Sequence, residues 1–88
     1  MAKRDFRHDE WSQEVRKRDK YTCQKCGKKS KRNQAHHIDS YDWFISGRYD
    51  IRNGATLCWG CHNAFHKIYG KGRNDRYQYY EFLKRRIR

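Results

Sequence analysis

The sequence predicts a small α+β domain that a bound metal ion holds together. Two Cys-x-x-Cys pairs enclose the middle of the chain, and segments with helical spacing lie outside them. Only 35% of the 88 residues are hydrophobic, so the core is small. A domain of this kind commonly needs a metal, disulfides or a partner for its stability. We therefore expect a single domain over residues 1–88 whose fold depends on its cysteines.

The four cysteines form two pairs, Cys23/Cys26 and Cys58/Cys61. Four thiolates at this spacing can close a tetrahedral structural zinc site, and Gly27 suits the tight turn after the first pair. Two disulfides are the alternative, as in small secreted proteins. The chain opens without an apolar signal segment and contains no apolar run of membrane-spanning length. We therefore expect a reducing, cytoplasmic location and favour zinc.

A helix is predicted over about residues 8–20. Trp11 and Val15 lie one turn apart and are expected in the core, whereas His8 is expected on the surface. The run NQAHHIDSY favours a short strand. Because neighbouring side chains of a strand point to opposite faces, His36 and His37 are expected to have different tasks.

The aromatic-rich stretch over residues 41–51 is predicted to be a loop or hairpin arm. Its Trp43, Phe44 and Tyr49 are expected to pack over the small core, with stacking on nucleic-acid bases as the alternative. Asn53-Gly54 is a turn signal. After it, a short strand is expected to lead into a helix that crosses the second cysteine pair.

A last helix is predicted over residues 75–87. Asp75-x-x-Gln78 resembles a capping box, and Tyr79 and Phe82 recur at helical spacing. Gly70 helps to break the chain before this helix.

The charge of the chain favours a polyanionic partner. Lys and Arg number 22 against 10 acidic residues, which gives a formal net charge of +12. Contacts of such a surface to phosphates make binding fall steeply with salt. Charge alone does not distinguish DNA from RNA or from an anionic membrane, although no basic segment has the clean apolar face of a membrane-surface helix.

The histidines follow the cysteines in an informative order: His36-His37, then Asn53, then His62 and His66. Together with EWSQEVRKRDKYTCQKCG and NGATLCWGCHNAFHKIYG, this order resembles the HNH endonucleases of the ββα-metal (His-Me) finger class, especially the small zinc-binding members of bacteriophages. The resemblance covers nearly the whole chain. It implies zinc knuckles and a ββα nuclease core over residues 23–66, with flanking helices.

The resemblance also implies a role for each of these residues. His37 would be the general base in hydrolysis of a DNA phosphodiester. Asn53 would orient His37 through a hydrogen bond to its main chain or ring. His36 and His62 would bind one catalytic divalent cation, with His66 as a further ligand or a phosphate contact. One such site cuts one strand per visit, so nicking is expected.

The identity of the catalytic metal is open. A histidine stands at position 36 where many family members carry aspartate, and this softer site suits Mn²⁺, Ni²⁺, Co²⁺ or Zn²⁺ as well as Mg²⁺. His62 directly follows Cys61, so it could instead replace a cysteine in the structural zinc site.

Other functions fit parts of the pattern. One is a non-catalytic zinc-ribbon module that binds nucleic acid through its basic surface, and another is a homing or restriction nuclease. The resemblance to phage proteins implies a role in genome packaging beside the terminase or portal proteins, in an infected or prophage-bearing bacterium.

Overall fold

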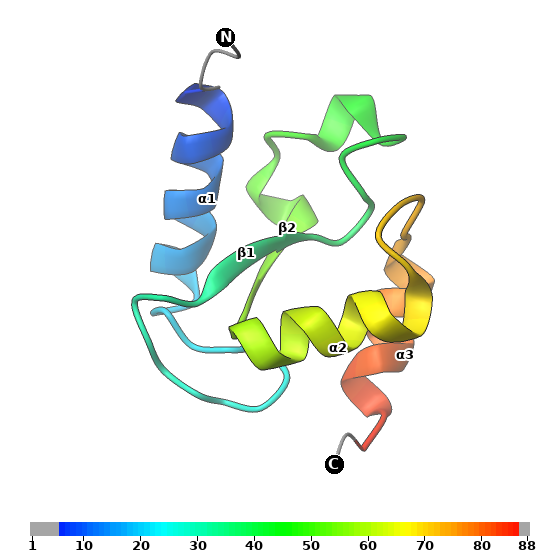
Figure 1. Ribbon diagram of the computed structural model, residues 1–88. Coiled ribbons are helices and arrows are strands. Elements are labelled where there is room, and N and C mark those ends of the chain that lie inside the picture. Colours follow the sequence, from blue (N-terminus) through cyan, green and yellow to red (C-terminus); the bar gives the residue numbers. More distant parts are fainter. Residues whose placement is uncertain (1–5, 87–88) are drawn as a thin grey trace, which may run out of the picture.

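The architecture is taken from a computed structural model, in which residues 6–86 are described. These residues form two strands, three α-helices and two short 3₁₀ helices (Figure 1), in the order α1 Phe6–Arg18, β1 Gln34–His37, η1 Ile45–Gly47, η2 Ile51–Asn53, β2 Gly54–Leu57, α2 Trp59–Tyr69 and α3 Arg76–Lys84. This arrangement confirms the predicted α+β class.

The sheet is a two-stranded antiparallel ribbon. Gln34 pairs with Leu57 at one end and His37 with Gly54 at the other. Both α1 and α2 contact both strands, and α3 packs on α2 (Figure 1). A two-stranded ribbon is at best marginally stable alone, so these helices provide the burial that holds it. The main buried cluster, between the sheet, α2 and α3, includes Leu57, Phe65 and Phe82.

Helix α1 packs unusually close to the start of β2. Trp11 and Val15 are buried as predicted. A Cβ added at Gly54 would lie 2.5 Å from Val15 Cγ2 and 2.8 Å from Trp11 Cζ2. The predicted Asn53-Gly54 turn is wrong, since Asn53 ends η2 and Gly54 is extended at the start of β2. Gly54 is needed here for space rather than for a turn.

The ends of the helices have local causes. The first helix stops at Arg18, short of the predicted end at residue 20, because Lys20 and Tyr21 adopt positive φ. The predicted capping box of α3 is confirmed, with both reciprocal hydrogen bonds between Asp75 and Gln78. The helix ends at Lys84, before the predicted end at residue 87, which lies outside the described residues.

The segment over residues 41–51 is not a hairpin arm. It contains η1 and the start of η2. Trp43 is 46% exposed and is held by a hydrogen bond from Nε1 to the Asn74 carbonyl, so the expectation that it packs over the core is wrong. Phe44 and Tyr49 are half-buried. Across residues 6–86, no helix combines the length and apolarity that spanning a membrane requires.

Candidate functional site

The side chains of the four cysteines form one cluster. Their Sγ atoms all lie within 4.8 Å of one another, and those of Cys26 and Cys58 are 3.7 Å apart. A tetrahedral zinc with Zn–S bonds of about 2.3 Å separates its thiolates by about 3.8 Å, whereas a disulfide requires about 2.05 Å. All four cysteines are free of disulfides. The cluster therefore fits a metal such as zinc.

Backbone amides donate hydrogen bonds to two sulfurs of this cluster and favour the thiolate form of Cys23. The amide of Cys26 donates to Cys23 Sγ at 3.5 Å, and that of Cys61 to Cys58 Sγ at 3.4 Å. Burial alone would raise the pKa of Cys23, but hydrogen bonds from backbone amides outweigh it and lower this pKa to about 7. Gly27 turns the chain after the first pair at a φ of +81°. Burial raises the pKa of Cys61, so a bound cation would be needed to keep all four sulfurs as thiolates.

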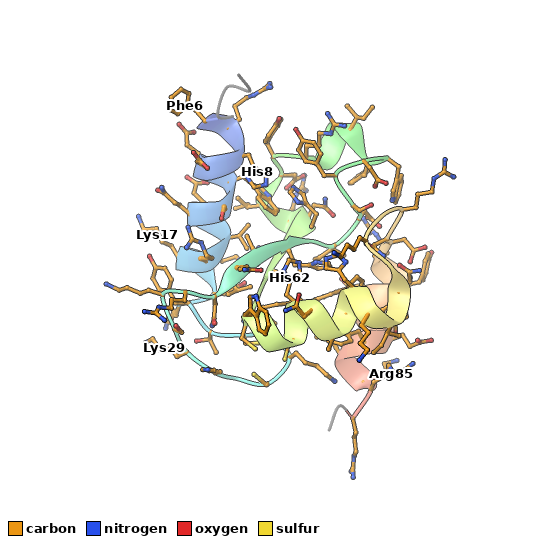
Figure 2. The ribbon with its side chains drawn as sticks, in the orientation of Figure 1. Phe6, His8, Lys17, Lys29, His62 and Arg85 are labelled. Carbon is orange, nitrogen blue, oxygen red and sulfur yellow. The ribbon has the colours of Figure 1, made fainter. Side chains whose placement is uncertain are left out.

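A second cluster consists of His36, His62 and His66, each of which has a ring nitrogen within 4.8 Å of the others. His36 points from β1 toward α2, where it is 97% buried against Phe65. His62 and His66 lie one turn apart on α2. Figure 2 shows His62 projecting from α2 toward β1. The structure thus places His62 with the histidines and apart from the cysteines.

Hydrogen bonds fix which nitrogen His62 and His66 present to this cluster. His62 Nδ1 donates to Gln34 Oε1 at 2.5 Å, and His66 Nδ1 donates to the Gly70 carbonyl at 2.9 Å. In the neutral rings both Nε2 atoms are therefore unprotonated, and they lie 3.1 Å apart. Among residues 6–86, the buried Nε2 of His36 has no hydrogen-bond partner. The lone pairs of His62 and His66 therefore face each other and repel unless a cation lies between them, and the His36 ring lies beside them.

The distances and charge states of the histidine cluster fit a divalent metal. Two nitrogens bound at about 2.1 Å lie roughly 3.0 to 3.4 Å apart at ordinary ligand angles. Burial lowers the pKa of His36 to about 3, with a further contribution from the neighbouring histidines. Burial also lowers the pKa of His62 to about 4. Both rings are neutral at physiological pH, as metal ligands must be.

His37 points to the opposite face of β1, toward α1. Its ring stacks on Trp11, with ring centroids 3.7 Å apart and planes inclined by 11°. Nε2 donates a hydrogen bond to the Arg48 carbonyl at 2.9 Å, so the neutral ring carries its lone pair on Nδ1. Burial lowers the pKa of His37, which keeps the ring neutral at neutral pH. The arrangement provides a fixed proton acceptor.

Asn53 is buried and holds the backbone around His37. Its Nδ2 donates to the carbonyls of Asp39, at 2.9 Å, and of Gly47, at 3.2 Å, while its Oδ1 accepts from the Asp39 amide. These partners differ from the expected bond to the main chain or ring of His37. Gly47 directly precedes Arg48, whose carbonyl holds the His37 ring. Asn53 is therefore connected to the His37 ring through the loop that carries Arg48.

Comparison with known proteins agrees with this geometry. Residues 23–67 match a family profile that is described as "HNH endonuclease". The chain belongs to the HNH endonuclease family. It is also 32% identical over 65 residues to the protein named Anaredoxin from Nostoc sp. (strain PCC 7120 / SAG 25.82 / UTEX 2576), an alignment that covers 74% of this chain and 83% of that protein. No solved structure matches the chain significantly.

In this HNH chain all five histidines line one cavity of about 850 Å³. The cavity lies beside β1 between α1 and α2, and its basic lining residues are Arg16, Lys31, Arg32 and Lys71. The two faces of β1 thus open into a common space, so the stacked His37 and the histidine cluster can reach one substrate.

The cavity also includes a residue that was expected to lie on the surface. His8 lines it, with its ring centroid 5.6 Å from that of His37. His8 is half-buried on α1 rather than fully exposed, so the expectation of a surface position holds only in part. Its position three residues before Trp11, on the apolar face of the predicted helix, was the available signal. The match to HNH endonucleases begins at residue 23 and leaves α1 outside.

Proposed function

We propose that this HNH chain is a metal-dependent DNA endonuclease that nicks one strand, with His37 as general base. The observation that carries the proposal is the pairing of two features along one cavity. Ring nitrogens of His36, His62 and His66 converge on one face of β1, and the unprotonated Nδ1 of His37 lies on the other. Each feature alone has structural explanations, but together they provide a proton acceptor beside a cation site.

The chain's own groups account for the proton transfer. Hydrolysis of a phosphodiester needs a water nucleophile and a base that removes its proton. His37 Nδ1 takes that proton, and the hydrogen bond from Nε2–H to the Arg48 carbonyl stabilises the imidazolium that forms. Trp11 restricts rotation of the ring by stacking on it. Asn53 keeps the Arg48 segment in place through Gly47.

The histidine cluster would hold the divalent metal that HNH nucleases use. When bound, such a cation supplies positive charge for the phosphoryl oxygens and the departing 3′ oxygen. His36, His62 and His66 provide three nitrogen donors, which suit Mn²⁺, Co²⁺, Ni²⁺ and Zn²⁺ better than Mg²⁺. The cysteine cluster would hold a structural zinc, since four thiolates leave no open position for a substrate.

DNA is the substrate that the surface favours. A net charge of +12 and the basic residues along the cavity match a polyanion with evenly spaced phosphates. Among the described residues that line this cavity, only Asp42 contributes a carboxylate. Assistance to a phage terminase or portal protein stays a prediction from the family resemblance, and co-purification with those proteins tests it.

The alternative is a zinc-ribbon module that binds nucleic acid without cutting it. Such a module gains nothing from an oriented neutral imidazole or from three converging histidine nitrogens, whereas a nuclease needs both. Incubation of supercoiled plasmid with Mn²⁺, Mg²⁺, Ni²⁺, Co²⁺ or Zn²⁺ separates the two functions. We expect nicked circles with at least one metal and none with His62→Ala. Salt-sensitive binding without nicking in any metal would support the binding module.

A further inference from the structure

We propose that His8 of α1 binds a phosphate of the DNA substrate beside His37, a role that rests on the proposed nuclease function. His8 lies outside the region matched by the HNH family. Its ring closes the cavity on the side of α1, where Figure 2 shows the side chain projecting from the helix toward the middle of the molecule. The helix would thereby add a substrate contact to the family's ββα core.

The ring of His8 is held by contacts that leave its nitrogens available. Its centroid lies 5.6 Å from Trp11, 5.6 Å from His37 and 6.1 Å from Tyr41. These are tilted or edge contacts between rings. Within residues 6–86, no protein group makes a hydrogen bond to either nitrogen of His8. An imidazole N–H that faces a cavity without a partner is suited to a phosphate oxygen.

His8 is the first of three polar residues on one face of α1. Ser12 and Arg16 follow at intervals of four residues and line the same cavity. Residues at this spacing lie above one another on a helix, so the three side chains form a row of hydrogen-bond donors. The row faces Lys31, Arg32 and Lys71 on other parts of the cavity wall. A chain of phosphates fits between these two sets of donors, and His8 contacts the phosphate nearest His37.

A structural role for His8 gives a different expectation. If the ring only packs against Trp11 and Tyr41, phenylalanine at position 8 preserves the contacts and the activity. If a nitrogen binds phosphate, phenylalanine is as harmful as alanine, and a side chain with an N–H donor restores part of the loss. The variants His8→Ala, His8→Phe and His8→Gln distinguish these outcomes.

The matched control is Lys17→Ala. Lys17 is an exposed cation on the same helix that does not line the cavity, and Figure 2 shows it directed away from the rest of the molecule. Its substitution removes one positive charge without touching the row of donors. Any general effect of the charge of α1 on DNA binding is therefore measured by this variant.

The experiment compares kcat and KM for nicking of supercoiled plasmid by the zinc-loaded wild type and these variants. We expect kcat/KM to fall by about 10-fold to 100-fold in His8→Ala and His8→Phe, the range for a hydrogen bond to a charged group, with partial recovery in His8→Gln. Lys17→Ala should stay within about 3-fold of wild type. Wild-type activity in His8→Phe would overturn the inference while leaving the nuclease intact.

A second measurement tests His8 separately from catalysis. Binding of a fluorescent DNA duplex without divalent metal is measured by anisotropy for the same proteins. If wild type fails to cleave in every metal, the proposed function fails, and weaker binding by His8→Phe than by Lys17→Ala still supports a phosphate contact. If His8→Phe binds the duplex as tightly as the wild type does, the proposed phosphate contact of His8 is overturned.

Discussion

The ring of Trp11 stacks on the ring of His37, with centroids 3.7 Å apart and an interplanar angle of 11°. Trp11 is itself fixed by a hydrogen bond from Nε1 to the Asp50 carbonyl at 2.8 Å. The proposed base is therefore held by a ring above it and by the Arg48 carbonyl at its edge. Both restraints depend on how closely α1 and the loop before β2 approach β1.

Gly54 permits that approach, so Gly54→Ala should destabilise the protein. The new Cβ would meet Val15 and Trp11 at 2.5 and 2.8 Å, and overpacking of this kind costs about 1 to 3 kcal/mol. Urea unfolding of the zinc-loaded protein measures the loss. Gly60→Ala is the matched control, because its Cβ meets nothing within 4 Å and alanine favours the helix. Equal stability of the two variants would show that α1 does not pack on Gly54.

Asn53→Ala should lower the rate of cleavage by about 10-fold to 100-fold, as expected for a residue that orients a functional side chain without touching the substrate. The variant loses the hydrogen bonds to Asp39 and Gly47, so the Arg48 carbonyl no longer holds the His37 ring in one orientation. The effect should fall on kcat more than on KM, because DNA contacts remain. Single-turnover nicking rates at saturating protein measure it. A change confined to KM would assign Asn53 to DNA binding instead.

The pH dependence of nicking should show an acidic limb below about pH 6.5. Burial lowers the pKa of His37 from its ordinary value, so the neutral ring persists as the pH falls through that value and is lost only below it. Activity requires the neutral ring, because a protonated imidazole accepts no proton. Rates from about pH 5 to about pH 8 at saturating metal locate the limb. A limb above the ordinary histidine value would contradict the burial of His37.

A chelator should remove the metal of the histidine cluster before that of the cysteine cluster. A moderate chelator is expected to remove the cation of the histidine cluster and stop cleavage while the circular dichroism spectrum stays unchanged. Loss of the zinc held by cysteine should unfold the chain, because structural zinc binding contributes about 10 to 16 kcal/mol in small zinc-finger peptides. Metal analysis beside spectroscopy follows both events. Unfolding in step with the first loss of activity would mean that one metal serves both purposes.

The sequence was most informative where local chemistry decides the structure. The cysteine spacing, the strand that separates His36 from His37 and the capping box of Asp75 and Gln78 all depend on residues close together in the chain. The structure confirms the capping box and places the cysteines in one cluster. These features could be predicted because the alternation of side chains along a strand and the hydrogen bonds of a helix cap involve only a few neighbouring residues.

The features that were missed depend on contacts across the chain. Gly54 was taken for a turn residue, but the constraint on it comes from α1, which lies about 40 residues earlier. The bonding of Asn53 to Asp39 and the place of His8 beside His37 also join residues that are distant in the sequence. No local pattern specifies which loop carbonyl holds a histidine, or which helix closes a cavity. Such contacts become visible only when the elements are assembled.

The central claim is that His37 acts as the base in DNA hydrolysis, and its most direct test is nicking by His37→Ala beside the wild type. Both proteins are first shown to carry one zinc and to bind duplex DNA with the same affinity. The account predicts metal-dependent nicking by wild type and a loss of at least about 100-fold in the variant, as expected for removal of a general base. Undiminished nicking by a clean preparation of His37→Ala would contradict it.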